Sequence, residues 1–164
     1  MDPTLEFLAF AAVNNLKAAG LTVATAESCT GGLIAAALTG VPGASAAFRY
    51  GWVTYCNEAK ERELNVPAAL IDEYTVVSEP VVAAMAESAM RKAGADCAVA
   101  VSGNAGPTAA VGEPPVGTVC IALSRRGAAR SHTETLYRPG MDRNAFRTMV
   151  AARALELIAG AAKG

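Results

Sequence analysis

Hydrophobic residues near the start of the chain recur at helical spacing and then give way to short apolar runs. Between residues 3 and 19 the apolar positions lie three or four residues apart, and Gly20 ends the pattern. These positions are Leu5, Leu8, Ala9, Ala12, Val13 and Leu16. The run 21–26 then predicts a strand, and the small apolar residues 33–39 predict a helix. The chain therefore opens as helix, strand, turn and helix.

The rest of the chain alternates between the same two patterns. The run 97–101 is apolar without interruption, which is typical of a strand buried on both faces. The segment 129–138 alternates less cleanly and is typical of an edge strand. Further strands are predicted at 48–56 and 116–123, and helices at 58–64, 78–93 and 143–159, with a short helical piece before residue 74. This order predicts an α/β fold, a three-layer α/β/α sandwich with a mixed sheet.

Composition narrows the class of protein. The 164 residues predict a single domain, 1–164. A formal net charge of −1, no basic run and 5% aromatic residues argue against nucleic-acid binding. No apolar run reaches about 18 residues, so we expect no membrane span and no membrane partner. The acidic N-terminus is unlike a signal peptide, and four dispersed cysteines without a C-x-x-C pair predict a cytoplasmic protein without a zinc site.

The turn after the first predicted strand is the strongest candidate for chemistry. Its sequence is Glu27-Ser28-Cys29-Thr30-Gly31-Gly32. It joins a strand to the amino end of a helix, where free N–H groups and the helix dipole suit an anion. It matches neither G-x-S-x-G nor G-x-x-x-x-G-K-[ST]. Three interpretations stay open: a phosphate site, a serine nucleophile in an oxyanion site, or a helix cap.

A serine nucleophile needs a base, and the sequence offers few. The single histidine, His132, lies in the predicted edge strand, where a solvated side chain is the simpler interpretation. Lys60 lies in the first turn of a predicted helix, where the helix dipole and any burial would lower the pKa of an amine. A neutral Lys60 could accept the proton of a serine hydroxyl. The alternative is a solvated lysine between Glu58 and Glu61.

Other side chains extend the candidate site. Tyr55, at the end of the preceding strand, could relay a proton or orient a ligand, or lie at the edge of the core. Cys29 is a rival nucleophile, because helix N-termini acidify thiols. The glycine-rich loop 102–108 suits a ribose or phosphate, or is only a turn. Arg143 and Arg147, one helical turn apart, could clamp a phosphate or carboxylate, or lie on the surface.

Together, four ordered segments resemble the CinA C-terminal domain family of nicotinamide-nucleotide amidases. The resemblance spans roughly residues 5–158. The four segments are Ala26-Glu27-Ser28-Cys29-Thr30-Gly31-Gly32, Tyr55-Cys56-Asn57-Glu58-Ala59-Lys60, Ser102-Gly103-Asn104-Ala105-Gly106-Pro107 and Pro115-Val116-Gly117-Thr118-Val119. No counterpart of the N-terminal molybdopterin-binding-like domain of longer members is recognised, so the chain resembles the stand-alone form.

The resemblance implies a CinA C-terminal-like fold and a hydrolysis. Nicotinamide mononucleotide and water would give nicotinic acid mononucleotide and ammonia, without metal or cofactor, which recycles pyridine nucleotide. Ser28 would attack the carboxamide carbon, and Lys60 would take the serine proton and return it to the leaving ammonia. Tyr55 would assist.

The resemblance also implies binding roles. Backbone N–H groups of Thr30, Gly31 and Gly32 would hold the oxyanion or the phosphate. The nucleotide would be bound by Ser102, Gly103, Thr108 and Arg143.

The sequence leaves some points open. Ala109 and Ala110 follow Thr108 where many family members have two glycines, which predicts a stiffer loop.

One rival function is a non-catalytic nucleotide-binding or regulatory module, in keeping with the family's competence and DNA-damage naming. Another is an amidase or esterase for a different small substrate. For an alanine-rich domain of this family we also expect a homodimer.

Overall fold

The computed structural model describes residues 1–162 and contains the predicted helices and strands in the predicted order. One short 3-10 helix, η1 (Ala44–Ala46), is added to them. The helices are α1 (Pro3–Ala19), α2 (Leu33–Thr39), α3 (Asn57–Leu64), α4 (Ala68–Tyr74), α5 (Glu79–Ala93) and α6 (Arg143–Ala161). The strands are β1 (Val23–Glu27), β2 (Phe48–Val53), β3 (Cys97–Gly103), β4 (Thr118–Arg125) and β5 (His132–Tyr137).

The strands form one mixed sheet in the order β2-β1-β3-β4-β5. β1 pairs in parallel with β2 and β3, which places Ala26 beside Trp52 on one side and Ala100 on the other. β4 runs antiparallel to both β3 and β5. The carboxyl ends of β1, β2 and β3 therefore meet at one edge of the sheet, which is where ligands bind in open α/β folds.

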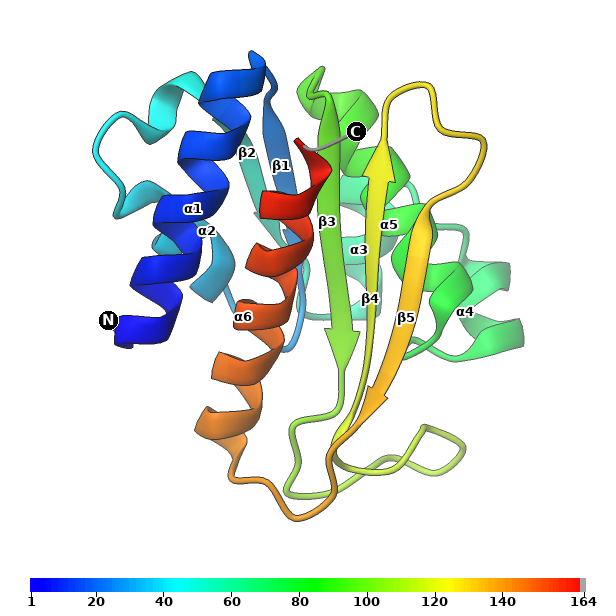
Figure 1. The fold of residues 1–164 in the computed structure, drawn as a ribbon. Helices are drawn as coiled ribbons and strands as arrows, with labels where there is room; N and C mark the ends of the chain where they lie inside the picture. Colours follow the sequence, from blue (N-terminus) through cyan, green and yellow to red (C-terminus); the bar gives the residue numbers. More distant parts are fainter. Residues whose placement is uncertain (163–164) are drawn as a thin grey trace.

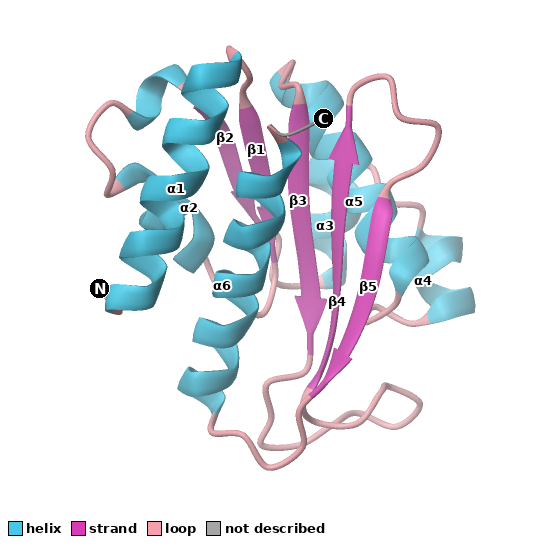
Figure 2. Ribbon diagram, in the orientation of Figure 1, coloured by secondary structure: helices cyan, strands magenta, loops and turns pink. Residues whose placement is uncertain are grey.

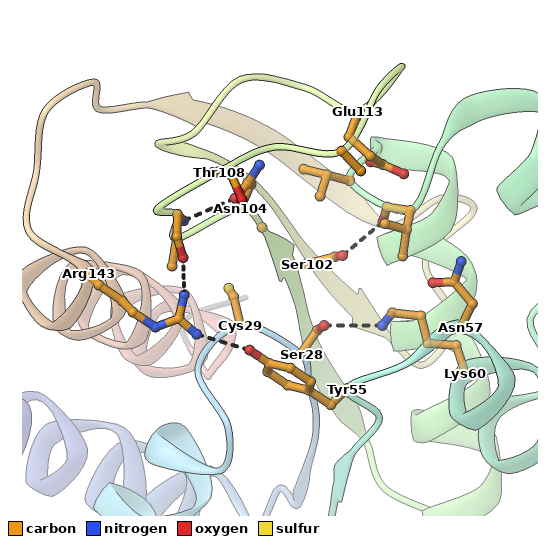
Figure 3. A pocket seen from close by; sticks show the side chains of 16 residues that line it. Ser28, Cys29, Tyr55, Asn57, Lys60, Ser102, Asn104, Thr108, Glu113 and Arg143 are labelled. Carbon is orange, nitrogen blue, oxygen red and sulfur yellow. Dashed lines mark hydrogen bonds between the residues drawn. The ribbon is translucent and has the colours of Figure 1, made fainter.

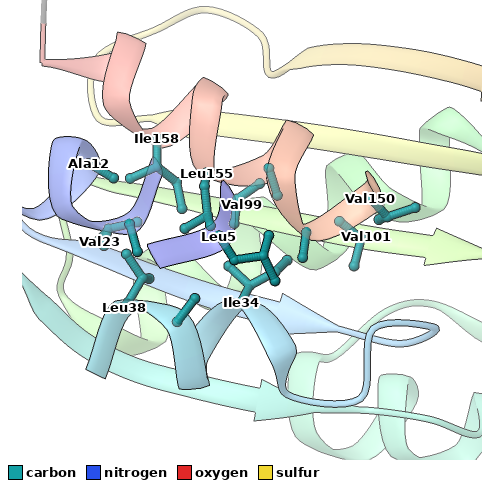
Figure 4. Packing of buried hydrophobic residues seen from close by; sticks show 14 of the residues in the cluster. Leu5, Ala12, Val23, Ile34, Leu38, Val99, Val101, Val150, Leu155 and Ile158 are labelled. Carbon is teal, nitrogen blue, oxygen red and sulfur yellow. The ribbon is translucent and has the colours of Figure 1, made fainter. Parts of the chain in front are cut away.

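Helices cover both faces of the sheet and give the predicted three layers. α1, α2 and α6 lie on one face, and α3, α4 and α5 lie on the other (Figure 1; Figure 2). The first face buries a cluster that includes Ile34, Val99 and Leu155 (Figure 4). The second face buries a smaller cluster in which Met85 of α5 lies with the alanines of β1 and β3. Small strand side chains let the helices approach the sheet closely.

The burial of two strands agrees with the sequence pattern. All residues of β3 before Gly103 are buried, as predicted for a strand covered on both faces. β5 lies at the sheet edge and contains only exposed and half-buried residues, as predicted for 129–138. β2 is shorter than predicted, because the chain leaves the sheet after Val53 to begin α3 at Asn57. Within residues 1–162, no helix has the length and apolar character needed to cross a bilayer.

Candidate active site

The candidate site lies where the carboxyl ends of the three parallel strands meet. Ser28 directly follows β1, Tyr55 follows β2, and Ser102 lies near the end of β3. All three line one pocket of about 360 Å³ (Figure 3). Pockets that take small ligands have volumes on the order of 300–1,000 Å³. The pocket is therefore large enough for a mononucleotide-sized ligand.

The turn that carries Ser28 is built around Glu27, for which no role was predicted from the sequence. The buried Glu27 carboxylate accepts hydrogen bonds from the Thr30 hydroxyl at 2.7 Å and from backbone N–H groups of α2 and its start. These N–H donors are Gly32 at 3.1 Å, Ile34 at 3.1 Å and Ala35 at 2.9 Å. Glu27 thus caps the positive end of α2 from inside the protein. The sequence signal for this cap is an acid directly before a glycine turn and a helix.

This cap changes the role expected of the turn's amides. The Gly32 N–H donates to Glu27, and the Gly31 N–H donates to the Ser28 carbonyl at 3.0 Å. Among residues 1–162, those that line the pocket do not include Thr30, Gly31 or Gly32. A helix end already neutralised by a carboxylate attracts a second anion weakly. The structure therefore gives no support to an anion-binding role for the Gly31 and Gly32 amides.

Arg147 supports the same turn from α6. Its Nε donates to the Cys29 carbonyl at 3.1 Å, and its Nη2 donates to the Thr30 carbonyl at 2.9 Å. Of the two interpretations left open for Arg143 and Arg147, a shared clamp is not favoured, because the Arg147 guanidinium donates to backbone carbonyls. Arg143, one turn earlier on α6, is the arginine that lines the pocket.

Ser28 and Lys60 meet in the pocket although they are far apart in the sequence. Lys60 Nζ lies 3.1 Å from Ser28 Oγ and 2.7 Å from the carbonyl oxygen of Thr54 (Figure 3). The Lys60 side chain is fully buried, so the alternative of a solvated lysine does not hold. The Thr54 carbonyl accepts one N–H of the amine. In the neutral amine this leaves the lone pair free to face the serine hydroxyl.

Burial sets the protonation of the two groups beside Ser28. Removal from water lowers the pKa of Lys60 to about 8, against smaller opposing contributions from Cys56 and Cys29. Burial also raises the pKa of the Cys29 thiol to about 12. The amine is therefore available as a base near neutral pH, whereas the thiol stays protonated. This favours Ser28 over Cys29 as the nucleophile.

Tyr55 and Arg143 form the outer wall of the pocket. Arg143 Nη2 donates to the Tyr55 hydroxyl at 3.0 Å, and Nη1 donates to the carbonyl of Gly106 (Figure 3). Tyr55 is 61% exposed, so it is not a residue of the core edge. The contact joins the β2–α3 connection, the β3–β4 loop and the start of α6 at the open side of the pocket.

The loop after β3 supplies the other predicted binding residues. Ser102 is buried in the pocket wall, and its hydroxyl donates to the Val76 carbonyl at 2.8 Å. Gly103 also lines the pocket, and a Cβ there would lie 2.9 Å from the Val119 side chain. Glycine is therefore required by the pairing of β3 with β4. Thr108 lies on the exposed part of the pocket wall.

Three further polar residues line the pocket without a role predicted from the sequence: Asn57, Asn104 and Glu113. Asn57 is the first residue of α3, and the Asn104 side chain accepts from the Gly106 N–H at 3.0 Å, which shapes the loop. Asn57 and Asn104 lie within the segments that carry the family resemblance, but polar residues at helix starts and in loops are common, so the sequence did not single out these three residues. Their role follows only from the way the loops fold over the sheet edge.

Comparison with known proteins agrees with the resemblance drawn from the sequence. Residues 5–162 match the CinA C-terminal domain. A CinA-like protein of Akkermansia muciniphila is 54% identical over 155 residues, which cover 94% of this chain and 37% of that protein. A CinA-like protein of Geobacter sulfurreducens is 51% identical over 137 residues, which cover 84% of this chain and 32% of that protein. The chain thus spans about a third of the length of these curated relatives.

Solved structures share the whole fold. The competence/damage inducible protein CihA from Agrobacterium tumefaciens superimposes with a TM-score of 0.91 at 37% identity, covering 96% of this chain and 95% of that chain. A CinA superfamily protein from Klebsiella pneumoniae gives a TM-score of 0.91 at 34% identity, covering 97% and 98%. The α/β sandwich is thus shared with these proteins. The chain belongs to the CinA C-terminal domain family.

Proposed function

We propose that this protein is an amidohydrolase that converts nicotinamide mononucleotide and water to nicotinic acid mononucleotide and ammonia. The observation that carries the proposal is the 3.1 Å contact between the buried Lys60 amine and the Ser28 hydroxyl in a mononucleotide-sized pocket. A serine hydroxyl becomes an effective nucleophile when a base lies within hydrogen-bond reach. Family membership supports this pairing, although the relatives' names say only CinA-like or competence/damage inducible.

The first half of the reaction forms an ester. Neutral Lys60 takes the proton of Ser28 Oγ as this oxygen attacks the carboxamide carbon. The Lys60 ammonium then gives that proton to the amide nitrogen, the C–N bond breaks, and ammonia leaves. The nicotinoyl group remains attached to Ser28 as an ester, and Lys60 is neutral again.

The second half hydrolyses this ester. Lys60 takes a proton from a water molecule as the water oxygen attacks the ester carbon. The proton returns to Ser28 Oγ when the C–O bond breaks, which releases the carboxylic acid product. One amine thus serves as base and acid in both halves, and the Thr54 carbonyl keeps it oriented toward Ser28 throughout.

The outer wall of the pocket suits the other end of the nucleotide. Arg143 is the cation there, and the N–H groups of its guanidinium that do not bind Tyr55 or Gly106 would donate to a phosphate. Tyr55 holds Arg143 through its hydroxyl and in this way assists from the rim. Ser102, Gly103 and Thr108 line the same pocket and would contact the ribose.

Ammonia release from nicotinamide mononucleotide tests the proposal. The wild-type protein is expected to release ammonia, and EDTA is expected to leave the rate unchanged because the Ser28–Lys60 pair needs no metal. Ser28→Ala removes the attacking oxygen and should abolish the release. Circular dichroism would check that the variant stays folded.

The same assay separates the rival functions. A folded wild-type protein that binds nicotinamide mononucleotide in calorimetry but releases no ammonia would be a binding or regulatory module. Faster release from another carboxamide in a panel at equal concentration would point to a different substrate. Full activity of Ser28→Ala would refute the serine mechanism.

The pH dependence of kcat/KM follows from the protonation of Lys60. Only the neutral amine can act as the base, and burial lowers the pKa of Lys60 to about 8. Below pH 8 the rate is expected to fall about tenfold per pH unit, and above pH 8 it should approach a plateau. Steady-state rates between pH 7 and pH 10 would measure the profile. A rate that falls as the pH rises from 7 to 9 contradicts a lysine base.

Two expectations from the sequence stay predictions. Sedimentation equilibrium would show whether the chain forms the expected homodimer. The four cysteines are all free thiols, which agrees with the cytoplasmic location that we propose.

A further inference from the structure

The pocket wall contains one buried carboxylate oxygen that makes no hydrogen bond within residues 1–162. Glu113 lies in the β3–β4 loop and lines the same pocket as Ser28 and Lys60 (Figure 3). Its Oε2 atom is buried and has no hydrogen-bond partner within residues 1–162. Buried polar atoms are nearly always hydrogen-bonded, because removing them from water is otherwise unfavourable. The unpartnered oxygen therefore indicates a donor or a positive charge that arrives with a ligand.

Charges are distributed unevenly around the pocket. Its charged lining residues within the described chain are Lys60, Glu113 and Arg143. In Figure 3, Arg143 lies at the left of the pocket and Glu113 at the upper right, with Ser28 in the centre and Lys60 below Glu113. A ligand in this pocket thus meets a cation at one side and an anion at the other. This arrangement is complementary to a zwitterion, a molecule with separated positive and negative charges.

We propose that Glu113 pairs with the positive charge of the ligand's pyridinium ring and so selects pyridinium carboxamides over neutral ones. This inference rests on the proposed function. In nicotinamide mononucleotide the ring nitrogen carries the ribose and is therefore positively charged, while the phosphate is negative. The carboxamide is attached to that same ring, so placing its carbon at Ser28 brings the ring's charge into the pocket. The phosphate is then directed toward Arg143.

The ribose offers a second kind of donor for the same oxygen. Its hydroxyls could donate to the Glu113 carboxylate without any contribution from the ring's charge. The two sources are distinguished by dihydronicotinamide mononucleotide, in which the ring is reduced and neutral. This compound keeps the ribose, the phosphate and the carboxamide.

The test compares the two nucleotides with Glu113→Gln, which keeps the shape of the side chain and removes its charge. Calorimetry is done on Ser28→Ala protein, with and without the Glu113 change, so that no substrate is consumed. We expect Glu113→Gln to weaken the binding of nicotinamide mononucleotide on the order of tenfold or more. The binding of the reduced nucleotide should change less than about twofold. Glu73 is exposed on α4, so Glu73→Gln removes the same charge away from the pocket and should change the affinity for neither nucleotide.

Other outcomes overturn the inference. If Glu113→Gln weakens the binding of both nucleotides equally, Glu113 contacts the ribose hydroxyls instead. If the binding of both is unchanged, Glu113 does not contact the ligand. Failure of the Ser28→Ala protein with intact Glu113 to bind nicotinamide mononucleotide also refutes the pairing. Failure of the proposed function is seen separately, as an absence of ammonia release by the wild-type protein, whatever the two affinities are.

Discussion

Replacing Lys60 with methionine is expected to lower the rate of ammonia release by about 10²–10⁴-fold, the usual contribution of a general acid–base group. Methionine has nearly the same length but no amine, so Ser28 would lose the group 3.1 Å away that takes its proton. The KM for the nucleotide should change little, because binding relies on other residues. Steady-state kinetics at pH 8.5 would measure both constants.

The same substitution should not unfold the protein. A lysine whose pKa is lowered from 10.5 to about 8 by folding disfavours the folded state at pH 7, when the amine is charged. That cost is on the order of 3 kcal/mol, and it disappears between pH 8 and pH 10.5, where the folded-state amine is neutral and the unfolded-state amine is still protonated. Methionine removes the cost but leaves the Thr54 carbonyl without its donor, at about 1–3 kcal/mol. The two effects are of similar size.

The pH dependence of stability tests whether the pKa of Lys60 is lowered in the folded protein. The free energy of unfolding of the wild type should rise relative to that of Lys60→Met between pH 8 and pH 10, because only the wild type titrates there. Lys92→Met is a suitable control, since Lys92 is exposed on α5 and contacts Asn65. An active Lys60→Met protein would exclude Lys60 as the base.

Replacing Glu27 with glutamine is expected to have the largest effect on stability. The carboxylate accepts four hydrogen bonds inside the protein, from one hydroxyl and three backbone N–H groups. A glutamine amide can keep one oxygen, but its NH2 group would face at least one of these donors. We expect a loss of about 2–4 kcal/mol, or roughly 5–15 °C in Tm. Thermal denaturation would measure it.

The Glu27 substitution should also reduce activity, because the same turn places Ser28. Glu6→Gln on the exposed side of α1 gives the same change in charge without a buried contact, and it should leave both Tm and activity unchanged. An unchanged Tm for Glu27→Gln would show that the carboxylate is not needed to build the turn.

The fold could be predicted because each element has a clear local pattern. The uninterrupted apolar run 97–101 marks β3 as buried, and Gly20 ends α1 with a positive φ of 67°. Strands alternating with helices then leave few ways to form a sheet. The order β2-β1-β3-β4-β5 itself came only from the structure, since no local pattern encodes which strands are neighbours.

The candidate site was predictable in part. Ser28 and Lys60 stand out through their places beside a turn and in a first helical turn, and the family resemblance assigned them a common role. The Thr54 carbonyl could not be foreseen, because every residue carries one. Helical spacing put Arg143 and Arg147 on one face of α6, but it could not show that one reaches the pocket and the other the Ser28 turn.

The contact of Arg143 with Tyr55 and Gly106 separates the rim of the pocket from its buried base. These residues hold three loops together at the open side of the pocket, whereas Ser28, Lys60 and Thr54 lie buried beneath it. Loops at a sheet edge tolerate change better than the buried strands that carry them. Substitutions at this rim would therefore change which ligands enter the pocket and leave the buried Ser28–Lys60 pair in place.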